Sequence, residues 1–235
     1  MIPKTIYFCV ALIGLALWLA NCEAHDIDQL EAEIRQLTPD TAVVLDVPQI
    51  VGSYGLLGIE HILSGIDHLM FVLALVFLFG FKRQLLIAVT GFTLAHSLTL
   101  ALGALGLVQL PSAPIETWIA LSIVMVSAEA LSSRDAMTRH FPFVVPLVIG
   151  LIHGLGFAGA LSAVGLPDAH RAAALLSFNL GVEAGQLGVI GLAWLIARVG
   201  RSFAWTRQTR FITLSAFGSI SAYWTIERVW ALVTA

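Results

Sequence analysis

The sequence predicts an all-α, polytopic integral membrane protein, and three observations support this fold class. Of the 235 residues, 58% are hydrophobic and 11% are charged, and the mean hydropathy is +0.91. Soluble domains are about 45–50% apolar and about 25% charged, which argues against a water-soluble globule. Six windows are long enough for a bilayer core, which needs about 20 apolar residues per helix. The net charge of −3 with 12 Lys and Arg residues excludes a basic nucleic-acid-binding protein.

The first 24 residues have the layout of a cleaved signal peptide. Lys4 precedes an apolar run over 6–20, and small residues stand at positions −3 and −1 of a cleavage site after Ala24. An uncleaved helix is the alternative, although this run is short for a span. Both cysteines lie in this segment, so its removal leaves the mature chain without a thiol ligand. Residues 25–53 are expected to form a short periplasmic tail.

A bundle of six transmembrane helices is predicted to follow, as a single domain over 54–235. Charges, prolines and glycines separate the helices, and Pro146 predicts a kink in the fourth. The expected spans are 54–80, 84–108, 115–133, 141–164, 172–197 and 211–233.

The basic residues predict the orientation of these helices. Eight of the twelve Lys and Arg residues lie in the first, third and fifth loops, whereas the second loop has none. Because cytoplasmic loops carry the excess of Lys and Arg, the odd loops should face the cytoplasm. Both ends of the mature chain should then face the periplasm, as a cleaved signal peptide requires. The expected location is therefore a bacterial inner membrane.

Ionisable side chains near the centres of the spans are the most informative feature. Such groups cost several kcal/mol in hydrocarbon and are rare unless they are paired or functional. Any one of them could form a hydrogen bond between helices, but four helices each place one near the midpoint. They are Asp67 and His68 in the first span, His96 in the second, His153 in the fourth and Glu183 in the fifth.

Further polar side chains share faces with these groups. On a continuous helix, the polar residues from Glu60 to His68 fall within an arc of about 120°. His61 and His68 would lie two turns apart, roughly 10.5 Å along the axis, so other helices must complete a site. Glu60, His61 and Glu116 are expected nearer the outside and Glu129 nearer the cytoplasm. The expected supporting polar residues are Glu60, Ser64, Ser97, Glu116, Glu129, Asn179 and Gln186.

Imidazole and carboxylate ligands without cysteine favour Ni²⁺, Co²⁺, Zn²⁺, Fe²⁺ or Mn²⁺ over Cu⁺. The first hypothesis is a permease with the lipid bilayer and a divalent metal ion as its partners, and a homo-oligomer is left open. The alternatives are an intramembrane Zn or Fe metalloenzyme, a metal-binding accessory protein, and a haem protein with two axial histidines. The candidate metal ligands are His61, Asp67, His68, His96, His153 and Glu183.

Several motifs resemble the HupE/UreJ family of bacterial membrane proteins, which is linked to nickel or cobalt uptake. The resemblance covers about residues 54–197 and is to a second, less characterised branch. It implies substrate-binding roles for His61, Asp67 and His68. The motifs are His61-x5-Asp67-His68, Ala95-His96-Ser97, His153-Gly154-Leu155-Gly156-Phe157 and Phe178-Asn179-Leu180-Gly181-Val182-Glu183.

Overall fold

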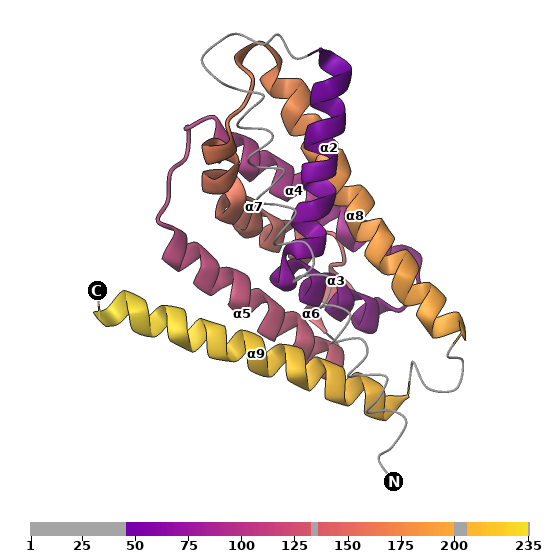
Figure 1. The fold of residues 1–235 in the computed structure, drawn as a ribbon. Coiled ribbons are helices and arrows are strands. Elements are labelled where there is room, and N and C mark those ends of the chain that lie inside the picture. The colour runs from indigo at the N-terminus through magenta and orange to yellow at the C-terminus, as the bar shows by residue number, and fades with distance from the viewer. Residues whose placement is uncertain (1–45, 133–135, 200–205, 235) are drawn as a thin grey trace.

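The computed structural model describes residues 46–132, 136–199 and 206–234, and these are all-helical without a strand (Figure 1). The all-α prediction is confirmed for this part of the chain. The predicted signal peptide and most of the predicted tail lie outside the described residues. The elements are α2 (Val47–Ser64), α3 (Ile66–Phe79), α4 (Arg83–Ala104), α5 (Ser112–Leu131), α6 (Met137–His140), α7 (Val144–Val164), a 3-10 turn (Asp168–His170), α8 (Arg171–Val199) and α9 (Arg207–Thr234).

The protein is a multi-pass membrane protein by the length and composition of its helices. Four helices, α4, α5, α7 and α8, can each cross a bilayer, and α2 with α3 can form a fifth, bent span. The sixth expected span, 211–233, is helical within α9, but α9 is more polar and is not among these candidates. A bundle of six spans therefore stays a prediction.

The first span is broken, whereas the sequence predicted one continuous helix over 54–80. Helix α2 ends at Ser64, Gly65 is extended with φ −72° and ψ 97°, and the axis of α3 departs from that of α2 by 73°. A Cβ on Gly65 would lie 2.8 Å from the His61 carbonyl oxygen and 2.9 Å from His68 Nδ1. Glycine therefore lets the two halves of the motif close on each other.

The predicted kink at Pro146 also needs correction. Helix α7 begins at Val144, so Pro146 lies in its first turn. Amide groups there have no partner within the helix in any case, so proline is tolerated at that position. Helix α7 continues without a break past His153.

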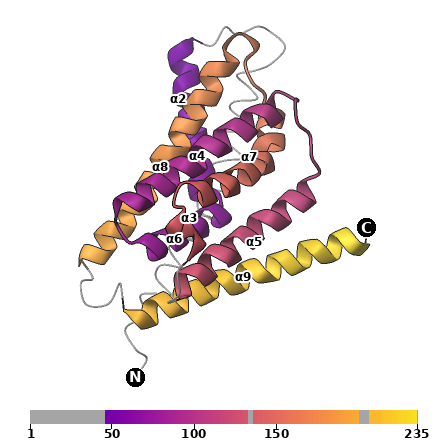
Figure 2. The ribbon, with the colours of Figure 1, turned by 180° about the vertical axis from the view of Figure 1, so that it is seen from behind.

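Helices pack along their lengths in three pairs, α2 with α8, α4 with α7, and α5 with α9 (Figures 1 and 2). Glycine makes the first two pairs close. A Cβ on Gly58 would collide with the carbonyl oxygen of Phe178, and one on Gly150 would collide with that of Phe92. In each pair, residues later in one helix contact residues later in the other. The two helices of each pair therefore run parallel.

The α2–α8 and α4–α7 pairs share one packing arrangement. It is built around a glycine and a histidine in α2, in the first half of the chain, and again in α7, in the second half. Gly58 stands three residues before His61, and Gly150 stands three residues before His153. In each case the glycine meets the backbone of a phenylalanine on the partner helix. The short Gly-x-x-His match in the sequence thus marks equivalent positions in three dimensions.

Substitution of either glycine should destabilise its helix pair. We expect Gly58→Ala and Gly150→Ala to lower the free energy of unfolding by about 1–3 kcal/mol, because the added methyl group meets backbone that cannot rotate away. Thermal unfolding in detergent measures this change. Gly52→Ala and Gly159→Ala are matched controls, because a Cβ at either position meets nothing within 4 Å. Unchanged midpoints for the first two variants would contradict the packing described.

Candidate metal centre

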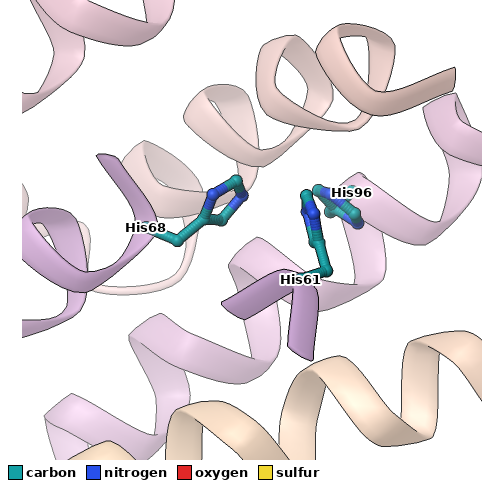
Figure 3. Close-up of side chains that lie close together, drawn as sticks. All are labelled: His61, His68 and His96. Atoms are coloured by element: carbon teal, nitrogen blue, oxygen red, sulfur yellow. The ribbon is translucent and has the colours of Figure 1, made fainter. Parts of the chain in front are cut away.

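Four histidines and one aspartate from four helices meet inside the bundle. His61 lies in the last turn of α2, Asp67 and His68 in the first turn of α3, His96 in α4 and His153 in α7. The ring centroid of His68 lies 4.5 Å from that of His61, 6.1 Å from that of His96 and 5.2 Å from that of His153. Figure 3 shows three of these rings around a common space.

The break at Gly65 brings His61 and His68 together. On an unbroken helix the two residues would be separated by roughly 10.5 Å along the axis. The bend of 73° instead places their rings edge to face at 4.5 Å between centroids. His61 therefore belongs to the same cluster as His68 and His96, and does not form a separate outer group with Glu60 as the sequence suggested.

The donor atoms form two overlapping groups. His61, His68 and His96 make one group, and Asp67, His68 and His153 make the other, with the ligand atoms of each group within 4.8 Å of one another. A tetrahedral ion with bonds of about 2.1 Å holds its donors roughly 3.4 Å apart. Small rotations of the side chains would convert either group into a coordination shell, and His68 is common to both.

Each of the four histidines also has a buried ring nitrogen without a hydrogen-bond partner among the described residues. Buried polar atoms are normally paired, because an unpaired one loses its hydration without compensation. Four such rings at one place could serve as a donor set for a cation. The unpartnered atoms are His61 Nε2, His68 Nε2, His153 Nδ1 and one ring nitrogen of His96, whose other nitrogen interacts with the side chain of Asn179.

Neighbouring acceptors fix the tautomers of two of these rings. Asp67 Oδ1 lies 3.1 Å from His68 Nδ1 and accepts a hydrogen bond from Nδ1–H, which leaves Nε2 with its lone pair free to bind a metal. Ser122 Oγ donates its only proton to the Ile119 carbonyl oxygen at 2.7 Å. Its oxygen, 3.1 Å from His153 Nε2, therefore accepts N–H from that ring and leaves Nδ1 as the lone-pair donor. In both rings the unpartnered nitrogen is the one able to bind a metal.

Aromatic rings close one side of the cluster. Phe157 and Phe178 stack on each other with centroids 5.4 Å apart, and Phe157 lies 4.0 Å from the His61 ring. Phe92 stacks on His96 at 5.8 Å and meets His153 edge to face at 5.1 Å. Apolar rings of this kind lower the local dielectric constant, which would strengthen the attraction between a cation in the cluster and Asp67.

A cavity of about 500 Å³ reaches the cluster, and Phe157 is among the residues that line it. His61, Asp67, His68 and His153 line its inner wall, whereas Glu116, Trp224 and Arg228 line the wall formed by α5 and α9. Six waters occupy about 180 Å³ at roughly 30 Å³ each, so a hydrated divalent ion fits. Arg228 Nε donates to Glu116 Oε2 at 2.9 Å across this wall.

Glu183, a predicted ligand, belongs to neither donor group. Its Oε1 accepts a hydrogen bond of 3.2 Å from Thr90 Oγ1 on α4. The cause is the register of α8, because Val182 is buried and Gly181 packs against α2, which turns the next side chain toward α4. Gln186 is also directed at α4, where its Oε1 accepts a bond of 2.8 Å from Thr93.

Three other supporting residues bond to their own helices. The donors are Ser64 Oγ, Ser97 Oγ and Asn179 Nδ2, and each donates to the carbonyl oxygen four residues earlier. Glu129 accepts hydrogen bonds from the backbone amides of Met137 and Thr138, so it holds the start of α6. Glu60 is half-buried on α2, one residue before His61.

Three residues that shape the histidine cluster or its cavity were not predicted from the sequence. Gly65 had a visible signal, because Ser64-Gly65 stands between the two halves of the His61-x5-Asp67-His68 motif and Ser/Gly pairs are frequent sites of kinks. Ser122 and Arg228 had no such signal. Their roles arise from how α5 and α9 pack, which no local pattern encodes.

The fold and the cluster define a class, a multi-pass helical membrane protein with a buried His/Asp centre. Comparison with protein families agrees with this class. A family model described as HupE / UreJ protein matches residues 39–228. The chain belongs to the HupE / UreJ family, as its motifs predicted. No curated protein and no solved structure gave a significant match.

Loss of the Asp67 carboxylate should weaken metal binding. We expect Asp67→Asn to raise the dissociation constant for Ni²⁺ or Co²⁺ by about 10- to 100-fold, because the variant removes a charge from the cluster and weakens the partner of His68 Nδ1. Isothermal titration calorimetry on purified protein measures this. His140→Ala, at an exposed position outside the cluster, is the matched control. Equal affinities for Asp67→Asn and the unmodified protein would contradict the assignment.

Proposed function

We propose that the protein is a permease for a divalent transition-metal cation of the nickel or cobalt type. One observation carries this proposal. Four histidines on four helices direct unpartnered ring nitrogens into one space, and a cavity connects that space to the surface. The proposed location is a bacterial inner membrane, with both ends of the mature chain in the periplasm.

The donor set determines the class of ion. Neutral imidazole nitrogens with one carboxylate suit borderline cations such as Ni²⁺, Co²⁺ and Zn²⁺. Asp67 and its partner His68 provide one negative charge and a ring of fixed orientation. The other rings provide neutral donors, so a divalent ion in the cluster keeps a net positive charge and can leave again. Reversible binding of this kind is what transport requires.

Two features of the fold favour transport over catalysis. A helix broken at the binding site and a duplicated packing arrangement are typical of secondary transporters. Here the break at Gly65 lies within the cluster, and the pairs α2–α8 and α4–α7 repeat one geometry. If α2–α3 straightened while α7 bent, the cluster would open to the other side of the membrane. The reverse change would return it to the first side.

The enzyme and haem alternatives have less support. Ser64 and Ser97 donate to carbonyl groups of their own helices, and Glu183 is bonded to Thr90, so these groups are not directed at an ion in the cluster. Phe92 packs against both His96 and His153, so the space that a porphyrin would need between those two rings is filled.

The route from outside begins at Glu116. Helix α5 starts at Ser112, directly after the loop predicted to face the periplasm. In the proposed orientation, Glu116 is therefore at the periplasmic end of the cavity that it lines. Its carboxylate attracts a cation, and Arg228 neutralises that carboxylate until the cation arrives. Once inside, the ion exchanges water for the imidazole groups around His68.

Loss of the shared histidine should abolish transport. We expect His68→Ala to lower uptake of radioactive Ni²⁺ or Co²⁺ into proteoliposomes by at least about tenfold, because both donor groups contain His68. His140→Ala should retain normal uptake. Normal uptake by folded His68→Ala would contradict the proposal.

Substitutions of Glu116 and Arg228, the ion pair at the cavity wall, should change the KM for metal uptake in opposite directions. We expect Glu116→Gln to raise the KM for metal uptake by about two- to fivefold and Arg228→Gln to lower it by a similar factor, the size typical of a partly exposed ion pair. Concentration series of uptake measure both. Both variants break one salt bridge, so a purely structural role would shift the two values in the same direction.

A further inference from the structure

A second polar cluster lies between α4 and α8, and its side chains offer oxygen ligands. Thr90 and Thr93 stand three residues apart on α4, and Glu183 and Gln186 stand three residues apart on α8, so each pair shares a helix face. Thr90 Oγ1 donates to Glu183 Oε1 at 3.2 Å, and Thr93 Oγ1 donates to Gln186 Oε1 at 2.8 Å. These four residues are called the oxygen cluster below.

The carboxylate of the oxygen cluster has no cationic partner. Within the described residues, Glu183 forms no ion pair with a Lys, Arg or His side chain. It is half-buried near the middle of α8, one of the helices able to cross the membrane, and Thr90 beside it is exposed. A carboxylate in hydrocarbon costs several kcal/mol, and one hydrogen bond to a charged group, of about 1.5–3 kcal/mol, offsets only part of that cost. A cation bound to Glu183 would offset the rest.

The chemistry of the oxygen cluster differs from that of the histidine cluster. Carboxylate, hydroxyl and amide oxygens are hard ligands that suit a proton or Na⁺, whereas imidazole suits transition metals. Glu183 is also absent from both groups of candidate metal ligands. The two clusters are therefore suited to different cations.

The same two helices connect the clusters. His96 lies one turn beyond Thr93 on α4. On α8, Phe178 lies just over one turn before Glu183, and its ring is 5.6 Å from that of His61. A change in charge between α4 and α8 therefore acts on helices that position His96 and His61. Coupled transport needs such a connection.

We propose that Glu183, supported by Thr90, binds the monovalent cation whose movement drives metal transport. The cation is a proton or Na⁺. In the proton case, the carboxyl O–H bond of Glu183 forms with a proton from one side of the membrane and breaks to release it on the other. No electron transfer takes place. This site rests on the proposed permease, and it assigns Glu183 a role separate from metal ligation.

Uptake driven by defined gradients tests the site in proteoliposomes. Glu183→Gln should lose gradient-driven Ni²⁺ uptake by at least tenfold, while its Ni²⁺ dissociation constant and its metal–metal exchange stay within twofold of normal. Glu183→Asp should recover part of the driven uptake. The control Glu227→Gln, at an exposed position on α9, should behave normally. Stimulation by a pH gradient identifies the proton, and stimulation by a Na⁺ gradient identifies Na⁺.

Two results would overturn the inference. One is gradient-driven uptake by Glu183→Gln at the normal rate. The other is a loss of Ni²⁺ affinity in Glu183→Gln of tenfold or more, which would make Glu183 a metal ligand.

Infrared difference spectroscopy separates this inference from the permease itself. A carboxyl band that responds to pH or Na⁺, and that is lost in Glu183→Gln but kept in Glu227→Gln, supports the site even if the unmodified protein fails to transport metal. A spectrum in which neither pH nor Na⁺ changes a band assigned to Glu183 would overturn the site even if metal uptake is normal.

Discussion

The break in the first span at Gly65 is the constraint on which the rest of the site depends. It turns α3 by 73° away from α2 and brings the His68 ring to 4.5 Å from the His61 ring. On an unbroken helix, His61 and His68 would lie roughly 10.5 Å apart along the axis and their rings would not meet. A side chain at position 65 would meet the His61 carbonyl oxygen and the His68 ring. The geometry of the candidate metal centre thus depends on Gly65, a residue that itself offers no side-chain donor.

Close packing around this break then determines which atoms can bind. Gly58 lets α8 pack directly against the backbone of α2, and Gly150 lets α4 pack directly against the backbone of α7. This close packing encloses the histidine rings. Asp67 and Ser122 accept the N–H groups of His68 and His153 and leave their other ring nitrogens unprotonated. Positioning of this kind by surrounding groups is what makes a metal site selective and reversible.

Much of the fold and part of the site could be predicted from the sequence. Long apolar windows follow directly from the thickness of a bilayer, and ionisable residues within them stand out because hydrocarbon excludes charge. The gathering of Asp67, His68, His96 and His153 was predictable on these grounds. The position of Glu183 was not, because the direction in which a helix faces its neighbours depends on contacts such as those of Gly181 and not on depth alone.

We propose that His61, His68, His96 and His153, with Asp67, form one site for a divalent metal. X-ray absorption spectroscopy of the purified protein loaded with Ni²⁺ or Co²⁺ tests it most directly. We expect a shell of nitrogen and oxygen at about 2.0–2.1 Å with the multiple-scattering pattern of at least three imidazole rings. A shell of oxygen alone, without imidazole scattering, would contradict it.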